Sequence, residues 1–318
     1  MSYAVGLKCG GCGKEFSARG MTYVCDACGK NLEVVYDYGA VARRLTRESL
    51  AGNADFSIWR YWDLYPLEDR GGVMPLQIGW SPIYRAEALA RALGVERLWV
   101  KDDGRNPSAS FKDRANAVAV AKAVELGFDK ICGASTGNAA SSTACLCASI
   151  GLSPIIFVPG AAPKAKIAQL LVFGARVFAV EGTYDEAFDL CLEAAAEYGW
   201  YNRNTGYNPF TTEGKKTAAY EIWEQLLRIQ MKGSQRVTIF IPVGDGNILT
   251  GIWKGFSDLL ALGWIEEIPK LIGVQAEGSA AIADAWMNDT EDIIPVEAHT
   301  LADIISVDLP RDGLRALK

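Results

Sequence analysis

The amino-acid sequence predicts an α/β fold with two doubly wound subdomains, preceded by a small cysteine-rich unit. From residue 81 onward, short apolar runs rich in Val, Ile and Phe alternate with longer helical patterns. Alternation of this kind produces parallel sheets that helices cover on both faces. Four cysteines within the first 28 residues form two closely spaced pairs, which indicates a separate unit stabilised by a metal.

The expected strands and helices follow one another along the second part of the chain. The expected strands are LWVKDD (98–103), KICGAS (130–135), PIIFVP (154–159), ARVFAV (175–180), VTIFIPV (237–243) and LIGVQA (271–276). The expected helices begin at Ser110 and about Ala139, span Ala162 to Phe173 and Tyr184 to Tyr198, continue beyond TTEGKK to Met231, span Ile248 to Leu260, and resume at Ser279. Residues 81–318 are therefore expected to form the main body.

Composition narrows the function. The 318 residues are 50% hydrophobic, with no apolar run long enough to span a bilayer and no signal-like N-terminus, so we expect a soluble, cytoplasmic protein. A net charge of −6 disfavours nucleic acid and anionic membranes as main partners, and favours a small-molecule ligand bound by a homo-oligomer. The lone histidine, His299, argues against histidine triads and multi-histidine metal sites. The lack of further histidines therefore favours lysine-based or cofactor-based chemistry.

The N-terminal cysteines have the spacing of a metal-binding ribbon over residues 1–38. Cys9 and Cys12 form one C-x2-C pair, Cys25 and Cys28 form the second, and twelve residues separate them. Two disulfides or four free thiols are the alternatives, and the missing secretory signal disfavours disulfides. We therefore predict a closed, structural zinc site without catalytic function. The remaining cysteines lie in apolar segments and are expected to be core residues: Cys132, Cys145, Cys147 and Cys191.

Residues 39–80 form a polar and aromatic connecting arm. Its stretch FSIWRYWDLYP is expected to pack onto the main body, because tryptophan and tyrosine bury large apolar surfaces.

One lysine, Lys112, has an unusual setting in the stretch NPSASFKDRAN (106–116). The simple interpretation is a capping box formed by Ser110 and Asp113, with the lysine facing water. However, a cation in the first helical turn opposes the helix dipole, and partial burial among small residues lowers its pKa further. A lysine biased toward its neutral form can form a Schiff base.

Two polar loops are expected at the carboxyl ends of strands, where open α/β sheets bind ligands. STGNAASS (135–142) offers hydroxyls, backbone amides and an amide side chain, and VGDGN (243–247) enters a helix whose N-terminus can hold a phosphate. Neither loop is a Walker or G-x-G-x-x-G motif, so each signal alone is weak. Together with Lys112 they supply the contacts that pyridoxal phosphate needs at its aldehyde, phenolate and phosphate.

The motifs KDDGRNPSASFKDR, ASTGNAASS, GARVFAVEG, NPFTTEGKKTAAYEI and PVGDGNILTGIWKGF resemble, in order and spacing, the threonine synthases among the fold-type II (tryptophan synthase β-like) pyridoxal phosphate enzymes. The likeness covers about residues 75 to 318, and several members carry a similar cysteine ribbon. It implies a lyase that converts O-phosphohomoserine and water to threonine and phosphate, with a small subdomain at about 110–205 closing on the larger one.

The resemblance also implies roles for individual residues. Lys112 would carry the cofactor and shuttle protons, and Asn138 would contact its phenolate. The substrate carboxylate would be received by Ser135, Thr136 and Gly137, and the cofactor phosphate by Val243, Gly244, Asp245, Gly246 and Asn247.

Two departures from the family pattern matter. The family's phosphate-gripping arginine is missing from NPFTTEG (208–214), so we expect Arg203 or Lys166 to replace it. The sequence ends at DLPRDGLRALK, before further family strands and helices, so we expect a truncated core with weak cofactor binding or poor turnover and an exposed apolar patch. The alternatives are a relative of the cysteate synthase, threonine dehydratase or diaminopropionate ammonia-lyase type, and an inactive zinc-bearing module.

Overall fold

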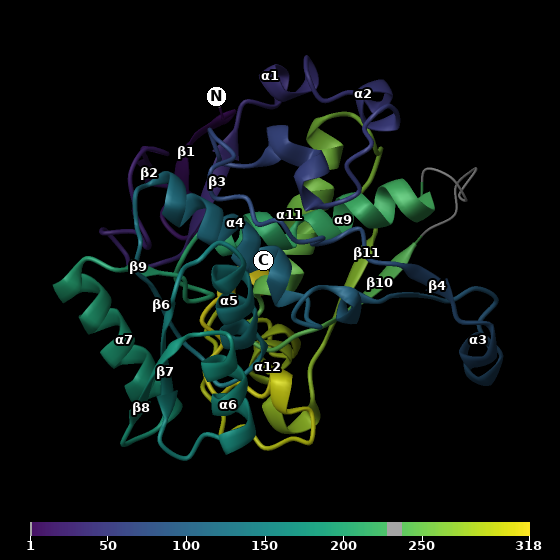
Figure 1. Cartoon of the computed structure of the whole chain (residues 1–318). Helices are drawn as coiled ribbons and strands as arrows, with labels where there is room; N and C mark the ends of the chain where they lie inside the picture. The colour runs from purple at the N-terminus through teal and green to yellow at the C-terminus, as the bar shows by residue number, and fades with distance from the viewer. Residues whose placement is uncertain (1, 228–236) are drawn as a thin grey trace.

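The computed structural model describes residues 2–227 and 237–318 (Figure 1). The N-terminal ribbon is an antiparallel sheet of β1 (Ala4–Cys9), β2 (Glu15–Phe16) and β3 (Leu32–Tyr36), in the order β2-β1-β3. Its apolar side chains pack with two of the cysteines and with Phe210 of the main body. The ribbon therefore shares its small core with the rest of the protein.

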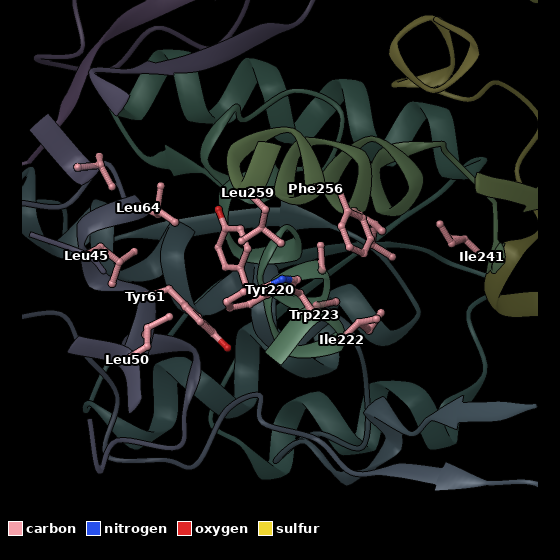
Figure 2. Packing of buried hydrophobic residues seen from close by; sticks show 14 of the residues in the cluster. Leu45, Leu50, Tyr61, Leu64, Tyr220, Ile222, Trp223, Ile241, Phe256 and Leu259 are labelled. Atoms are coloured by element: carbon pink, nitrogen blue, oxygen red, sulfur yellow. The ribbon is translucent and has the colours of Figure 1, made fainter. Parts of the chain in front are cut away.

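The connecting arm wraps the main body, as expected. It contains α1 (Tyr38–Ala42), α2 (Arg47–Ala51) and a 3-10 helix, η1 (Ile58–Leu64). Figure 2 shows Tyr61 and Leu64 of η1 beside Tyr220 and Leu259, which belong to the body. Trp59, Tyr61 and Tyr65 of the arm are thus buried core, whereas Phe56 is half exposed.

The first α/β unit has a four-stranded parallel sheet in the order β8-β7-β6-β9. The strands are β6 (Ile131–Ala134), β7 (Ile155–Pro159), β8 (Arg176–Val180) and β9 (Tyr201–Asn202). The helices around it are α4 (Lys112–Glu125), α5 (Asn138–Ser149), α6 (Lys164–Val172) and α7 (Tyr184–Tyr198). Within β7, Ile155 and Phe157 face α7, whereas Ile156 and Val158 face α5 and α6. The period-two alternation of a strand thus buries both faces of the sheet.

The second unit contains parallel strands β10 (Thr238–Pro242) and β11 (Lys270–Val274). Its helices are α8 (Phe210–Lys215), α9 (Thr217–Ile222), a π-helical turn η3 (Trp223–Leu227), α11 (Asn247–Ala261), α12 (Ala281–Met287) and α13 (Gly313–Leu317). Three short 3-10 turns complete the chain: η2 (Asp103–Arg105), η4 (Glu277–Ser279) and η5 (Asp303–Ile305). No helix among the described residues is long and apolar enough to cross a membrane.

Several elements differ from those expected. The LWVKDD strand is β5 (Trp99–Lys101), which pairs antiparallel with β4 (Ile83–Arg85) around α3 (Glu87–Leu93), and this hairpin extends away from the body (Figure 1). The sequence reading also missed the two-residue strand β9. The long helix expected beyond TTEGKK is divided into α9 and η3, a further helix, α8, lies on the motif itself, and the expected end at Met231 lies outside the described residues. Of the four expected core cysteines, Cys145 is only partly buried.

The capping box at Ser110, the simple alternative for the setting of Lys112, does not form. The Asp113 carboxylate accepts hydrogen bonds from the backbone N–H and hydroxyl of Ser108, at 2.7 and 2.5 Å. Ser110 instead accepts the Lys112 N–H, at 3.0 Å. The Asp113 carboxylate therefore bonds to the turn before α4 instead of forming the capping box.

Helix α4 starts against α8 because Gly214 has no side chain. A Cβ placed on Gly214 would lie 1.8 Å from the carbonyl oxygen of Arg114. The buried Arg114 guanidinium pairs with Asp103 at 2.7 Å and with Glu221 of α9 at 2.5 Å. This network fixes the first turn of α4, and with it the backbone of Lys112.

We expect Arg114→Met to lower the free energy of unfolding by about 3–5 kcal/mol, because it removes the guanidinium from Asp103 and leaves the buried Glu221 with Lys101 as its cation. Urea unfolding followed by circular dichroism measures the change. Lys130→Met is the matched control: it removes an exposed ion pair with Asp129 and should change stability by less than about 1 kcal/mol. Equal effects of the two substitutions would contradict a structural role for the Arg114 network.

Candidate active site

A cavity of about 430 Å³ opens at the carboxyl ends of β6 and β10. Its lining comes from the start of α4, the loops after β6 and β9, the loop before α11, the N-terminal parts of α6 and α7, and a C-terminal stretch that includes residues 303–309. The position agrees with the rule that open α/β sheets bind ligands beyond their strand ends.

Lys112 is the first residue of α4, and its side chain lines this cavity. Within residues 2–227 and 237–318 its amine has no hydrogen-bond partner and no carboxylate in contact. Burial lowers the pKa of Lys112 below its ordinary value, the Arg203 guanidinium lowers it further, and Asp245 opposes the shift. The amine is therefore both accessible to a ligand and biased toward its neutral, nucleophilic form.

The loop after β6 presents polar groups to the cavity at the N-terminus of α5. Ser135, Thr136, Gly137 and Asn138 all line the wall. A Cβ placed on Gly137 would meet no atom within 4 Å, so glycine keeps the space beside the helix N-terminus open. The helix dipole makes this position favourable for a carboxylate or a phenolate.

The loop before α11 contributes Val243, Gly244, Asp245 and Gly246 to the opposite wall. Gly246 has a φ of +94°, and a Cβ there would lie 2.8 Å from the side chain of Ala316, so the turn requires glycine. Because α11 begins directly after it, the loop faces the cavity with the positive end of a 15-residue helix.

Asn247, the last residue of the predicted phosphate loop, does not line the cavity. Its buried amide donates hydrogen bonds to Thr212 at 2.9 Å and to Asp312 at 2.7 Å. It also accepts a hydrogen bond from the amine of Lys215. Its side chain therefore anchors the loop from behind.

The two residues expected to replace the missing arginine both line the cavity, but they differ in burial and in their partners. Arg203 is 2% exposed, and within the described part of the chain its guanidinium donates one hydrogen bond, to the Thr205 hydroxyl at 3.2 Å. Lys166 is more exposed and already forms an ion pair with Asp303 at 2.9 Å.

The sequence analysis missed other cavity residues. Tyr184 and Asp185 lie in the first turn of α7, and Asn204 and Thr205 follow β9. A capping box at Thr183 marks the start of α7 after β8, and that signal could have revealed the first pair. The second pair had no comparable signal, because a two-residue strand shows no periodicity.

The C-terminal wall was also missed. Val307 donates its backbone N–H to the hydroxyl of Ser279 at 3.0 Å, which ties the stretch 303–309 to η4. Ser306 lies within this stretch and lines the cavity.

Comparison with known proteins identifies the chemistry. The family model described as "Pyridoxal-phosphate dependent enzyme" matches residues 74–318. The threonine synthase of Methanocaldococcus jannaschii is 37% identical over 98% of this chain and 75% of its own length, and that of Methanosarcina acetivorans is 36% identical over the same shares. The chain belongs to the threonine synthase family of pyridoxal-phosphate dependent enzymes. It is a lyase of that family.

Solved structures agree on the fold. The processed threonine deaminase isoform 2 of Solanum lycopersicum superposes with a TM-score of 0.61 at 24% identity, over 74% of this chain and 62% of its own. Maize serine racemase gives 0.62 at 19% identity, over 74% and 69%. At these identities the likeness shows the fold-type II architecture alone, which confirms the predicted fold class.

The residues of this chain that line the cavity fit pyridoxal phosphate. The cavity contains a lysine without a partner in the described structure, open space beside Gly137, and two helix N-termini suited to anions. An aldehyde, a phenolate and a phosphate can each find a group of matching chemistry here.

The four N-terminal cysteines also come together. Their sulfurs all lie within 4.8 Å of one another, with Cys9 and Cys28 at 3.4 Å and Cys12 and Cys25 at 3.6 Å. The backbone N–H groups of Gly11 and Cys12 donate to the Cys9 sulfur. Sulfurs bound at about 2.3 Å around a tetrahedral zinc lie roughly 3.8 Å apart, so the cluster has the dimensions of such a site.

Lys215 is a second buried lysine beneath the cavity. Burial lowers its pKa to about 7, with the nearby cations Lys112 and Arg203 adding to the shift and Asp245 opposing it. Between about pH 7 and its ordinary pKa of 10.5, the unfolded chain holds a proton that the folded protein has released. The free energy of unfolding therefore rises with pH across this window, and below pH 7 the full penalty of the buried charge applies.

We expect Lys215→Met to reduce this rise in stability between pH 7 and 9, since the residue that causes it is gone. Urea unfolding of the cofactor-free protein at both pH values measures the slope. Lys164→Met, at an exposed position of α6, should leave the slope as in the unsubstituted protein. An unchanged slope in Lys215→Met would show that Lys215 keeps an ordinary pKa.

Proposed function

We propose that this chain converts O-phospho-L-homoserine and water to L-threonine and phosphate, with pyridoxal phosphate bound in the cavity. The observation that carries the proposal is the unpartnered Lys112 amine between two helix N-termini, in a chain 37% identical to a threonine synthase. Bound pyridoxal phosphate supplies an electron sink for negative charge that develops on the amino-acid substrate. The chain's own residues bind, orient and move protons.

Lys112 is the proposed covalent anchor and proton carrier. Its depressed pKa supports attack on the cofactor aldehyde, because a neutral amine is the reactive form. Once released by substrate, the same amine would accept and return protons at the substrate's Cα and Cβ. A lowered pKa favours an amine that can both accept and return a proton.

The cofactor would be held at its two ends. The Asn138 amide is the proposed donor to the phenolate oxygen. The loop from Val243 to Asn247 is the proposed phosphate site, supported by the positive end of α11. Asn247 would act by anchoring this loop, since its side chain bonds Thr212 and Asp312.

The substrate would be held by its two anionic groups. Ser135, Thr136 and Gly137 would receive the carboxylate at the start of α5, with hydroxyl and N–H donors. For the substrate phosphate, Arg203 is the better supported of the two expected cations. It is buried without a carboxylate partner in the described structure, whereas Lys166 is already neutralised by Asp303.

The proposal includes the domain division expected from the sequence. Residues 1–38 would form the zinc ribbon, 39–80 the arm and 81–318 the catalytic core, with 110–205 as the small subdomain that closes over substrate. A cytoplasmic location and a homo-oligomeric state belong to the same proposal. The enclosed four-stranded sheet of β6 to β9, with helices on both faces, supports a separate small subdomain.

A product assay tests the function. The purified protein, supplied with pyridoxal phosphate, should release threonine and phosphate in equal amounts from phosphohomoserine. Lys112→Ala should lower kcat by at least about 10²-fold, because it removes both the covalent anchor and the proton carrier. It should also lose the pyridoxyl-lysine peptide that borohydride reduction traps in the unsubstituted protein.

Lys130→Ala, at an exposed site, is the control and should keep the trapped peptide and the turnover. Release of pyruvate or 2-oxobutyrate without phosphate would replace the proposal with an ammonia-eliminating reaction. A trapped peptide that persists in Lys112→Ala would assign the cofactor to another lysine.

We also propose that Cys9, Cys12, Cys25 and Cys28 bind one structural zinc ion. All four corners are cysteine, so the site is closed and has no position for substrate. The ribbon's core contains few apolar residues and relies on Phe210 of the body, which supports a need for a metal crosslink.

Zinc removal should destabilise the ribbon. We expect about one zinc per chain by metal analysis of protein purified without added zinc, and loss of the metal in Cys9→Ser. That variant should also unfold at a lower temperature, because metal binding is coupled to folding of such ribbons. Cys145→Ser, away from the cluster, should retain the metal. Native protein with no zinc and four titratable ribbon thiols would rule the site out.

A further inference from the structure

Two arginines from distant parts of the chain line the same cavity. Arg203 follows β9, and Arg311 precedes α13, and both line the wall. A Cβ placed on Gly206 would lie 2.7 Å from the Cβ of Arg311, so the missing side chain lets Arg311 pack directly on the loop after Arg203. Gly206 also has a φ of +77°, which favours glycine at this turn.

Arg203 has unused capacity to bind an anion. The guanidinium is buried and donates one hydrogen bond to the Thr205 hydroxyl, while its buried Nε has no partner in the described structure. A buried cation without a counter-ion is costly, so an anion that enters the cavity gains a strong partner at this wall.

Arg311 is held in a different way. Its guanidinium pairs with Asp185 at 2.7 Å and lies 5.0 Å from the centre of the Phe188 ring. Both charged partners are partly exposed, with 34% of the Arg311 side chain and 50% of the Asp185 side chain accessible. Ion pairs this exposed contribute little, so a dianion can displace the single carboxylate. Asp185 lines the cavity too, which puts the exchange within reach of a bound substrate.

We propose that Arg203 and Arg311 together form the subsite for the substrate phosphate, and that Asp185 holds Arg311 until that phosphate displaces it. The inference rests on the proposed function, since it takes a phosphorylated amino acid as the ligand. A phosphomonoester dianion matches two guanidinium groups through charge and paired N–H donors. The Thr205 hydroxyl adds a donor at the same wall. Tyr184 also lines this wall, where its hydroxyl donates to the Ala134 carbonyl at 3.4 Å.

The proposed subsite predicts that substitution of its arginines and substitution of Asp185 have opposite effects on phosphate affinity. Calorimetric titration of the cofactor-loaded protein with inorganic phosphate should give at least tenfold weaker binding in Arg311→Gln and in Arg203→Gln. Asp185→Asn should bind phosphate two- to fivefold more tightly, since the competing carboxylate is gone. Lys164→Met, exposed and outside the cavity lining, should stay within twofold of the unsubstituted protein.

Steady-state kinetics with phosphohomoserine test whether the subsite binds the phosphate group of the substrate as well as inorganic phosphate. Arg311→Gln should raise KM at least tenfold with kcat changed less than threefold, and Arg311→Lys should recover part of the loss without the paired donors. Phosphate affinity within twofold of the unsubstituted protein in Arg311→Gln would overturn the assignment, as would undetectable phosphate binding by the unsubstituted protein. Weaker phosphate binding by Asp185→Asn would overturn the proposed displacement of Asp185 from Arg311 by phosphate.

These results are distinguishable from failure of the proposed function. If the unsubstituted protein binds phosphate through Arg311 but releases none from phosphohomoserine, the reaction proposal fails and the subsite stands. If it makes threonine with a KM that Arg311→Gln leaves unchanged, the subsite fails and the reaction stands.

Discussion

The buried charge network around Arg114 is the interaction on which the active site depends. Arg114 lies two residues after Lys112 and bridges Asp103 to Glu221, while Lys101 pairs with the same glutamate at 2.6 Å. Arg114 bonds both carboxylates with more than one guanidinium nitrogen, a geometry that restricts rotation of the side chain. The network therefore fixes the direction in which α4 begins and the point where the reactive amine enters the cavity.

A second set of buried charges joins the cysteine ribbon to the same helices. The Tyr36 hydroxyl of β3 donates to Glu213 at 2.6 Å, and the Lys254 amine donates to the Val34 carbonyl at 2.9 Å. Lys216 pairs with Glu213 at 2.6 Å and with Asp258 at 2.9 Å. Glu213 precedes Gly214, the residue that lets α4 approach α8. The ribbon is thus joined to α8, which packs against the first turn of α4, where Lys112 lies.

The electrostatics of the cavity follow from this arrangement. Two helix N-termini and two buried cations, Lys112 and Arg203, face the cavity, and the Asp245 carboxylate acts on the charge of both. Burial disfavours each of these charges, so the pKa values of both cations are lowered. Such a site gains most from ligands that carry several negative groups, and a phosphorylated cofactor with a phosphorylated amino acid supplies them.

The sequence by itself determined the elements whose signals are local. Alternating apolar runs predicted β6, β7 and β8 in parallel order, the cysteine spacing predicted a cluster, and the setting of Lys112 predicted an amine with a lowered pKa. These features depend on periodicity, spacing and helix polarity, which act within a few residues. The capping box at Ser110 failed because a neighbouring hydroxyl, that of Ser108, competed for the same carboxylate.

Only the tertiary structure decided which distant residues share the cavity. Arg311 and Ser306 reach the wall because the C-terminal stretch packs closely on Gly206, where a side chain would clash with Arg311, and on Gly244, where a Cβ would lie 3.2 Å from Ile305. Asn247 does not line the cavity, because its side-chain amide donates hydrogen bonds to Thr212 and Asp312. Contacts between segments about 100 residues apart leave no periodic trace in the sequence, since they arise from close packing and pairing of buried polar groups after the chain has folded.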